Sequence, residues 1–203
     1  MSEKKKNPVI RTALLFIIAF TIICGGIYTA VCTGIGQVLF HDKVNGSIIE
    51  IDGKKYGSSL LAQEFTGDEY LWGRIMNVDT GTYVDDEGNP VMYSGPSNKT
   101  PAGDELQELI NERVAKLKAA NPDMDESKIP VDLVTASGSG LDPEISPAAA
   151  DYQVARVAKA RNMSEDEVKE VIKKYTTGRT FGVFGEPRVN VLKVNLALDG
   201  ILK

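Results

Sequence analysis

The sequence predicts an α+β protein: a single N-terminal transmembrane helix followed by one extracytoplasmic globular domain. Two observations lead to this prediction. Residues 12–40 contain no charged side chain, a run of 29 residues, whereas a spanning helix needs roughly 20. Residues 41–203 combine apolar residues at helical spacing with short alternating segments and turn signals, which is typical of an α+β domain.

The direction of the span follows from the charges before it. Residues 1–11 carry four basic side chains and one acid, and basic residues favour the cytoplasmic side of a membrane. We therefore expect a single-pass protein of the cell membrane, with a basic cytoplasmic tail over residues 1–11, a transmembrane helix over residues 12–40 and an extracytoplasmic domain over residues 41–203. A cleaved signal peptide is the alternative, but its apolar region is only about 7–15 residues long.

Small residues gather on one face of the second half of this span. Gly26, Ala30 and Gly34 follow one another at intervals of four, and Gly25 belongs to the neighbouring ridge. Small residues allow a second helix to approach closely in a membrane, where lipid offers no hydrophobic driving force. We expect this face to pack against a helix of a partner.

The first part of the outer domain predicts a hairpin and then a loop. Residues 47–51 and 54–56 are strand-like and flank Asp52-Gly53, a favoured two-residue hairpin turn. Residues 77–100 are rich in Gly, Asp, Asn, Pro and Ser, so we expect a long exposed loop there.

The second part predicts three helices and two strands. Pro101 opens the first helix, which ends before Pro122. Ser146 caps the second, which has Pro147 at its first position and ends at Asn162. The third begins with a capping box of Ser164 and Glu167 and closes at Gly178. The expected strands cover residues 131–134 and the alternating segment 192–198.

Composition excludes several classes of function. The formal net charge is −5, and that of residues 12–203 alone is −8, which argues against a nucleic-acid partner because such partners require clustered Lys and Arg. The two cysteines, Cys24 and Cys32, lie in the span, and His41 is the only histidine. Neither a histidine-based zinc site nor a histidine-dependent nucleophile can therefore be assembled, and we expect no metal site and no catalytic residues.

Two Gly-rich segments stand out, residues 134–143 and residues 182–190. The first leads into the helix capped by Ser146, and free N–H groups before a helix can bind an anion. Glycines also occur where tight packing leaves no room for a side chain. On the residues alone, a binding site and close packing both stay open.

These segments resemble the C subunit of the Kdp potassium-transporting ATPase. The likeness extends over nearly the whole chain, including the anchor, and Glu144 departs from it because the family usually has a histidine there. The strongest matches are Thr135–Pro143, Ile145–Ala150, Gln153–Ala158, Gly185–Leu192 and Asn195–Asp199.

The resemblance implies a non-catalytic accessory subunit of an ATP-driven potassium uptake pump, and thus not an enzyme in itself. The implied partners are a channel-like subunit that selects potassium, a P-type ATPase subunit that hydrolyses ATP, and a small single-span subunit, all in the lipid bilayer. Functional roles are implied for the matching motif residues: Ser137, Gly138, Ser139, Gly140, Asp142, Gln153, Glu186, Arg188 and Asn190.

Three roles are compatible with this resemblance. Within the family, the C subunit has been proposed to raise the ATP affinity of the ATPase subunit, with the Gly-Ser segment and the glutamine that matches Gln153 implicated. The predicted topology places Ser137 and Gln153 across the membrane from ATP, so we expect no tightly bound cofactor and favour a subunit that stabilises the complex and caps the potassium entrance. An anchored extracytoplasmic sensor or solute-binding module is the third role.

Overall fold

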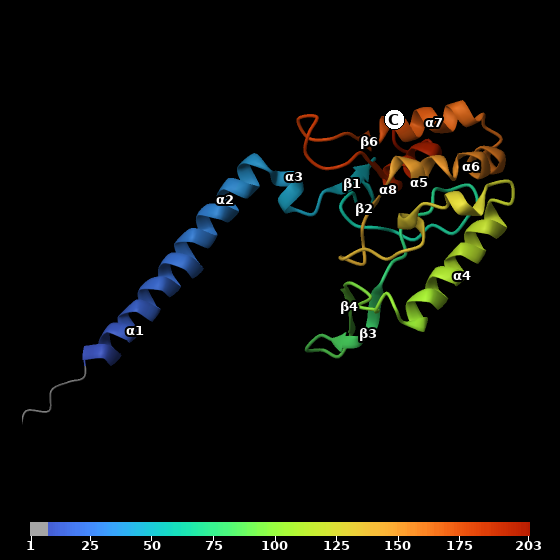
Figure 1. Ribbon diagram of the computed structural model, residues 1–203. Coiled ribbons are helices and arrows are strands. Elements are labelled where there is room, and N and C mark those ends of the chain that lie inside the picture. The colour runs from blue at the N-terminus through green and yellow to red at the C-terminus, as the bar shows by residue number, and fades with distance from the viewer. Residues whose placement is uncertain (1–7) are drawn as a thin grey trace, which may run out of the picture. The chain divides into compact units, whose positions relative to one another are not determined.

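The computed structural model describes residues 8–203, and the predicted basic side chains Lys4, Lys5 and Lys6 lie outside this range. The chain divides into two compact units, with the division between Ser47 and Ile48. The first unit is helical and the second mixes helices with short strands (Figure 1).

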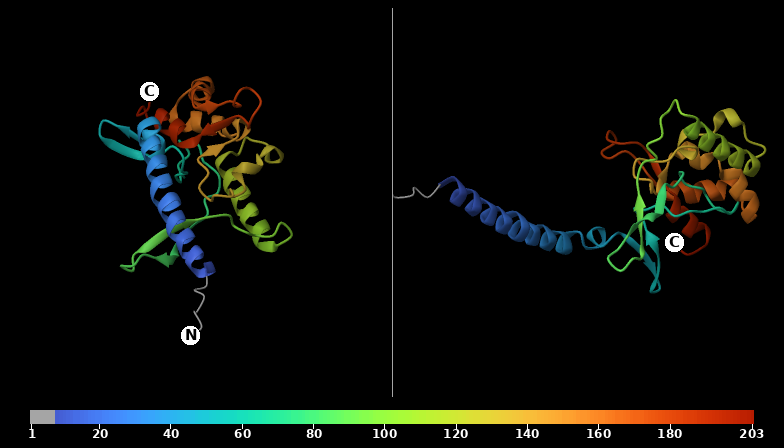
Figure 2. Two further views of the ribbon diagram at one scale, coloured as in Figure 1. Left: turned by 90° about the vertical axis from the view of Figure 1, so that its left-hand side faces the viewer. Right: turned by 90° about the horizontal axis from the view of Figure 1, so that it is seen from below.

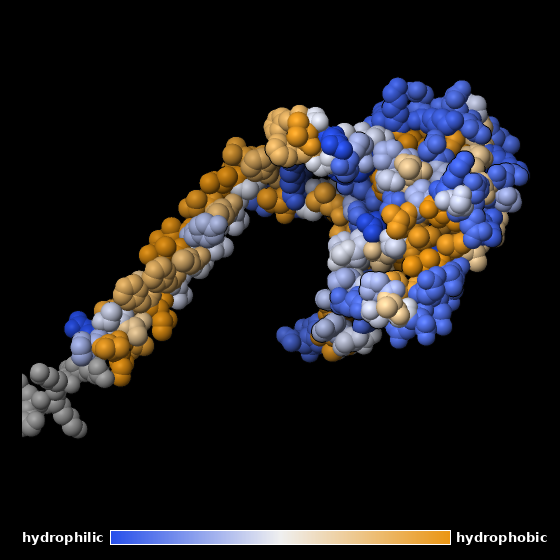
Figure 3. Space-filling view, in the orientation of Figure 1, coloured by the Kyte–Doolittle hydropathy of each residue, from blue (hydrophilic) through white to orange (hydrophobic). Residues whose placement is uncertain are grey.

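The first unit is one long helix followed by a short turn. Helix α1 (Pro8–Phe20), a π-helical segment (Thr21–Tyr28) and α2 (Thr29–Leu39) run on without a break, and α3 (His41–Val44) follows after Phe40. Its large apolar side chains are exposed (Figure 3). Within residues 8–203, only this helix is long and apolar enough to cross a membrane.

The second unit begins with the expected hairpin. Strand β1 (Ile48–Ile51) pairs antiparallel with β2 (Lys54–Ser58). Asp52 and Gly53 both have positive φ, 53° and 76°, as the first and second central residues of a type I′ turn require. The prediction of a hairpin at this Asp-Gly turn is confirmed.

A second hairpin replaces the loop that we expected over residues 77–100. Strands β3 (Val78–Val84) and β4 (Pro90–Ser94) pair antiparallel, so the loop prediction was wrong for these residues. Tyr83 pairs with Val91, and such β-branched and aromatic residues favour strands. The turn residues that dominate the composition are concentrated between the strands, where the Asp85 carboxylate accepts hydrogen bonds from the N–H groups of Glu87 and Asn89.

The remaining elements pack as short helices around a small sheet, in which β7 lies between β5 and β6 and pairs antiparallel with both. Figure 2 shows this arrangement from two further sides. In chain order the elements are α4 (Asp104–Ala120), two 3-10 helices (Glu126–Lys128 and Val131–Leu133), β5 (Glu144–Ile145), α5 (Pro147–Asp151), α6 (Val154–Arg161), α7 (Glu165–Lys174), β6 (Thr176–Thr177), β7 (Arg188–Asn190) and α8 (Val191–Leu198).

Two of the three predicted helix starts, at Ser146 and Ser164, are confirmed, whereas α4 begins at Asp104 and not at Pro101. The helix expected from Ser146 to Asn162 is divided into α5 and α6. The Ser146 hydroxyl accepts a hydrogen bond from the Ala149 N–H at the start of α5. Both halves of the capping box formed by Ser164 and Glu167 are present at the start of α7. Asn162 ends α6 in the left-handed region at φ 52°. The third helix, however, stops at Lys174 and not at Gly178, because the chain enters β6 at Thr176.

Both strands predicted in the second part were wrong. Residues 131–133 form a 3-10 helix, and residues 191–198 form α8. The alternation of apolar residues over 192–198 misled the prediction because α8 is buried on more than one face, so a period of two and a helical period both fit it. The Asn190 side chain caps this helix by accepting a hydrogen bond from the Lys193 N–H.

The hydrophobic core lies among α4 to α8 and the β5–β7–β6 sheet. Leu71 and Trp72 also belong to it, although they come from a segment without regular secondary structure. Its fully buried members include Leu117, Leu133, Ala149, Ala150, Val157, Val168, Val189 and Val194.

Candidate functional site

The candidate site is built around the irregular segment Leu71–Arg74, which Gln153 holds from inside the core. The Gln153 side chain is fully buried. Its Nε2 group donates to the carbonyls of Trp72 and Ala149 at 3.1 and 3.0 Å. Its Oε1 atom accepts from the Trp72 N–H at 2.8 Å and from Arg156 at 2.7 Å. Both polar atoms of this family-motif side chain are therefore used inside the domain.

A second amide holds the preceding residue in the same way. The Asn195 Oδ1 atom accepts from the Leu71 N–H at 2.8 Å, and its Nδ2 group donates to the Leu71 carbonyl at 3.0 Å. The sequence analysis missed Asn195. The available signal was a polar side chain within the apolar run 191–198, since a buried amide requires partners.

Arg156 anchors the chain just before this segment. The guanidinium donates to the carbonyls of Asp68 and Tyr70 at 2.6 and 3.0 Å, and it lies 4.3 Å from the centre of the Trp72 ring. Burial lowers the pKa of Arg156 to about 10, which leaves the side chain protonated at neutral pH. Together Gln153, Asn195 and Arg156 replace the backbone pairing that a regular element would supply.

The Gly-Ser segment folds onto itself. The Ser137 hydroxyl accepts from the Gly140 N–H at 3.0 Å, and the Ser139 hydroxyl accepts from the Leu141 N–H at 3.2 Å. At the start of α5, the Asp132 carboxylate accepts from the Ser146 N–H. These N–H groups are therefore already bonded within the domain, which favours the packing interpretation of this segment over anion binding.

Gly140 is the point where three segments of the chain cross. It has φ of +73°, and a Cβ atom added there would lie 2.5 Å from the Asn77 carbonyl oxygen and 2.6 Å from that of Gly95. A Cβ added at Gly138 would have no atom within 4 Å. Of these two glycines, only Gly140 is demanded by packing.

Asp142 joins the Gly-Ser segment to the core segment. Its carboxylate lies 3.3 Å from Arg74 Nη1, and it accepts a hydrogen bond from the Glu144 N–H. Arg74 in turn donates to the Ala136 carbonyl at 2.9 Å. The two segments are therefore held together through a half-buried ion pair.

The C-terminal motif residues lie at separate places along β7 and its approach. Glu186 pairs with Arg179 at 2.6 Å on the surface. Arg188 pairs with Glu144 at 2.8 Å, so the residue at the position where the family usually has histidine forms an ion pair here. Asn190 donates to the Ser59 carbonyl and caps α8.

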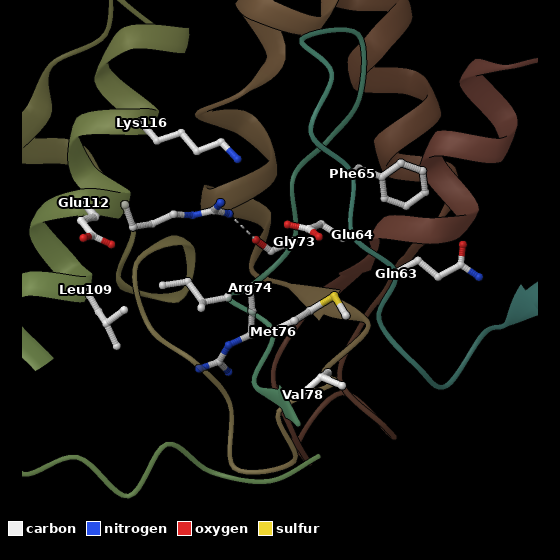
Figure 4. Close-up of a pocket in the computed structure, with 12 residues that line it drawn as sticks. Gln63, Glu64, Phe65, Gly73, Arg74, Met76, Val78, Leu109, Glu112 and Lys116 are labelled. Atoms are coloured by element: carbon white, nitrogen blue, oxygen red, sulfur yellow. Dashed lines mark hydrogen bonds between the residues drawn. The ribbon is translucent and has the colours of Figure 1, made fainter. Parts of the chain in front are cut away.

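A cavity of about 440 Å³ opens in front of the core segment, beside Gly73 and Arg74 (Figure 4). Arg113 reaches from α4 and donates to the Gly73 carbonyl at 2.8 Å, and burial lowers its pKa. Lys116 and Glu112 also line the wall from α4, so the lining carries charges of both signs. None of the residues for which the resemblance implies a functional role lines this cavity.

The small residues predicted for helix packing are all on the long helix. Gly25, Gly26 and Ala30 are exposed, and so is Gly34. A Cβ added at any of the three glycines would meet nothing within 4 Å. As for metals, the part of the chain from residue 8 onward contains no group of three or more His, Cys, Asp or Glu side chains that could hold an ion.

Comparison with known proteins gives a consistent result. The family model for the K+-transporting ATPase, c chain (KdpC), matches residues 10–200. The potassium-transporting ATPase KdpC subunit of Clostridium perfringens is 59% identical over 195 residues, which covers 96% of this chain and 98% of the relative. The KdpC subunit of Clostridium botulinum strain Eklund 17B is 58% identical over 98% of this chain and 100% of the relative. The KdpC subunit of Paraburkholderia phytofirmans is 47% identical over 93% of this chain and 95% of the relative.

Proposed function

The chain belongs to the KdpC family, the C chains of K+-transporting ATPases, and from this premise we propose that it is a non-catalytic accessory subunit of a potassium uptake pump. It assembles with a channel-like subunit, a P-type ATPase subunit that hydrolyses ATP and a small single-span subunit, and it stabilises their complex. The long apolar helix anchors it in the cell membrane with the N-terminus in the cytoplasm. The second unit lies outside and caps the potassium entrance.

The observation that carries this proposal is the engagement of Gln153. Its side chain is fully buried and both of its polar atoms are hydrogen-bonded within the domain. A direct nucleotide contact would require these groups to leave partners that are themselves buried, at a cost of about 1–3 kcal/mol for each group left unpaired. This cost supports a structural role for Gln153 within the domain, and it argues against a role in raising the ATP affinity of another subunit.

Assembly through the long helix is the part of the proposal that can be tested first. The ridge of Gly26, Ala30 and Gly34 is open surface, as a docking face for a partner helix requires. We expect the double variant Gly26→Leu with Gly34→Leu to reduce recovery of the other pump subunits when the complex is purified through a tag on this chain. The matched control is the double variant Ala13→Leu with Ala19→Leu, which also enlarges two small residues but in the first half of the helix.

The result that contradicts this assembly mode is equal recovery of the subunits with the double variant and with the control. A sensor or solute-binding module would bind its solute without the partner subunits, whereas an accessory subunit would not. We therefore expect the purified full chain in detergent micelles to bind potassium no better than sodium. Selective binding of potassium by the chain alone would favour the sensor.

A further inference from the structure

Three strongly exposed apolar side chains of the second unit lie together at the tip of a hairpin between β6 and β7. Phe181 is 90% exposed, and Val183 and Phe184 are each 68% exposed. Residues 180–185 carry no charge. We call residues 179–186 the apolar hairpin; Figure 1 shows it as the orange-red loop that extends from β6 away from the packed helices. Apolar groups gathered in this way in water mark a surface that contacts something else.

The apolar hairpin is held in one conformation. Thr180 and Phe184 exchange two backbone hydrogen bonds, of 2.8 and 3.0 Å, and Arg179 pairs with both carboxylate oxygens of Glu186 at the base. Phe181 adopts φ of 54°, a region that a bulky residue rarely occupies. The backbone at Phe181 is therefore strained although the side chain contacts little of the domain and is 90% exposed.

The charge around the apolar hairpin is opposite to that of the rest of the domain. Residues 173–188 contain four basic side chains, Lys173, Lys174, Arg179 and Arg188, and a single acid, Glu186. The sequence of this segment sums to +3, and to +1 when Glu144 and Glu170, the ion-pair partners of Arg188 and Lys173, are included. Residues 12–203 as a whole sum to −8, so an anionic surface repels the remainder of the domain but not this segment.

The anchor determines which surface is within reach. Only residues 40–47 separate the last residue of the long helix from the first residue of β1. Fully extended, these eight residues span about 27 Å, so the second unit is confined to the neighbourhood of the bilayer. Aromatic side chains combined with nearby cations are typical of segments that enter the headgroup region.

We propose that the apolar hairpin is a second membrane contact of this protein, which inserts Phe181, Val183 and Phe184 at the boundary between headgroups and acyl chains of anionic lipid. Together with the helical anchor, it forms a two-point attachment that restricts rotation of the domain about its tether. The proposal does not depend on the role of the subunit in the pump.

The test places an indole in the apolar hairpin of the full chain and asks whether lipid reaches it. The variant Phe181→Trp is reconstituted into vesicles of phosphatidylcholine and phosphatidylglycerol whose acyl chains are brominated, because bromine quenches indole emission on contact. Wild-type protein reports the contribution of Trp72, which is buried in the core. The matched control is Val131→Trp, a position that is 70% exposed and close in sequence to the acidic residues Asp125, Glu126 and Asp132.

We expect the indole at position 181 to lose most of its emission in brominated vesicles. The loss should be smaller in each of three cases: when Phe184→Ser is added, when the vesicles contain phosphatidylcholine alone, and when the salt concentration is high. The indole at position 131 and wild-type protein are expected to change little. Equal emission with brominated and ordinary lipids at position 181 would overturn the proposal. So would an indole that stays exposed in vesicles and becomes shielded only when the other pump subunits are added, because that result assigns the apolar hairpin to a protein partner.

Discussion

At the scale of single residues, the domain depends on two side-chain amides that hold consecutive peptide groups. Gln153 bonds both backbone groups of Trp72, and Asn195 bonds both backbone groups of Leu71. The two side chains come from different parts of the chain and are fully buried. An irregular segment can therefore pass through the core without leaving its polar groups unpaired.

The first prediction follows from this arrangement. Gln153→Leu leaves the Trp72 N–H, the Trp72 carbonyl and the Nη2 group of Arg156 without the partner that Gln153 supplies. We expect it to destabilise the domain by about 2–4 kcal/mol. The measurement is urea unfolding of the full chain in micelles, followed by Trp72 emission. Gln107→Leu, at an exposed position on α4, is the control and should change the stability little. Unchanged stability of Gln153→Leu, together with weaker ATP affinity of the assembled pump, would favour the nucleotide role.

A second prediction separates two glycines of the same motif. Gly140→Ala places a methyl group against the backbone of Asn77 and Gly95 at a positive φ, whereas Gly138→Ala meets open space. We expect the first to destabilise by more than about 1 kcal/mol and the second to be nearly neutral. The same urea titration measures both. Equal effects of the two substitutions would show that Gly140 is not the crossing point of these segments.

At the scale of elements, the capping box of α7 gives a prediction for pH. Hydrogen bonds from the backbone N–H and then the hydroxyl of Ser164 lower the pKa of Glu167 below its ordinary value of 4.5. Since the folded pKa lies below the unfolded one, the stabilisation is fully present above about pH 4.5 and is lost as pH falls through the lowered pKa.

We expect Glu167→Gln to be less stable than wild type at neutral pH, with the difference shrinking toward zero in acid. Thermal unfolding of both proteins from neutral pH down to about pH 3 measures this difference. Glu170→Gln, on the same helix outside the capping box, should show no such convergence. A difference between wild type and Glu167→Gln that is constant over this range would exclude the carboxylate bond as the cause.

The elements also show what local sequence can predict. Ser146 and Ser164 specify helix starts because their side-chain hydroxyls accept hydrogen bonds from nearby N–H groups. Asp52-Gly53 specifies a turn through its own backbone conformation, so all three features could be predicted. Helix α8 could not, because its burial on several faces comes from tertiary packing and hides the helical period. The β3–β4 hairpin was missed because turn residues outweighed Tyr83 and Val91 in the composition.

The candidate site was predictable only in part, for the same reason. The family resemblance pointed to Gln153 and the Gly-Ser segment, but it could not indicate that their polar groups bond within the domain. That depends on Leu71 and Trp72, which are 82 and 81 residues away from Gln153 in the sequence, and on Asn195. Contacts between such distant positions are set by the assembled core and leave no periodic pattern.

At the scale of the whole molecule, the chain consists of two parts with different surfaces. The long helix exposes apolar side chains over its length, and the second unit is a compact domain with its own core. Basic residues precede the helix and an acidic domain follows it, which favours a cytoplasmic N-terminus and a domain on the outside. With that orientation, the Gly-Ser segment and Gln153 are separated from cytoplasmic ATP by the membrane.

One measurement tests this claim most directly. Cys24 and Cys32 are replaced by Ala, Ser139→Cys places a single thiol on the exposed part of the Gly-Ser segment, and intact cells are treated with a membrane-impermeant thiol reagent. Gly138→Cys, at the neighbouring exposed position, serves as a second reporter. The account predicts labelling of both positions in intact cells, as expected for an accessory domain that acts outside the membrane. Labelling only after lysis would contradict it and would place the segment on the side of ATP.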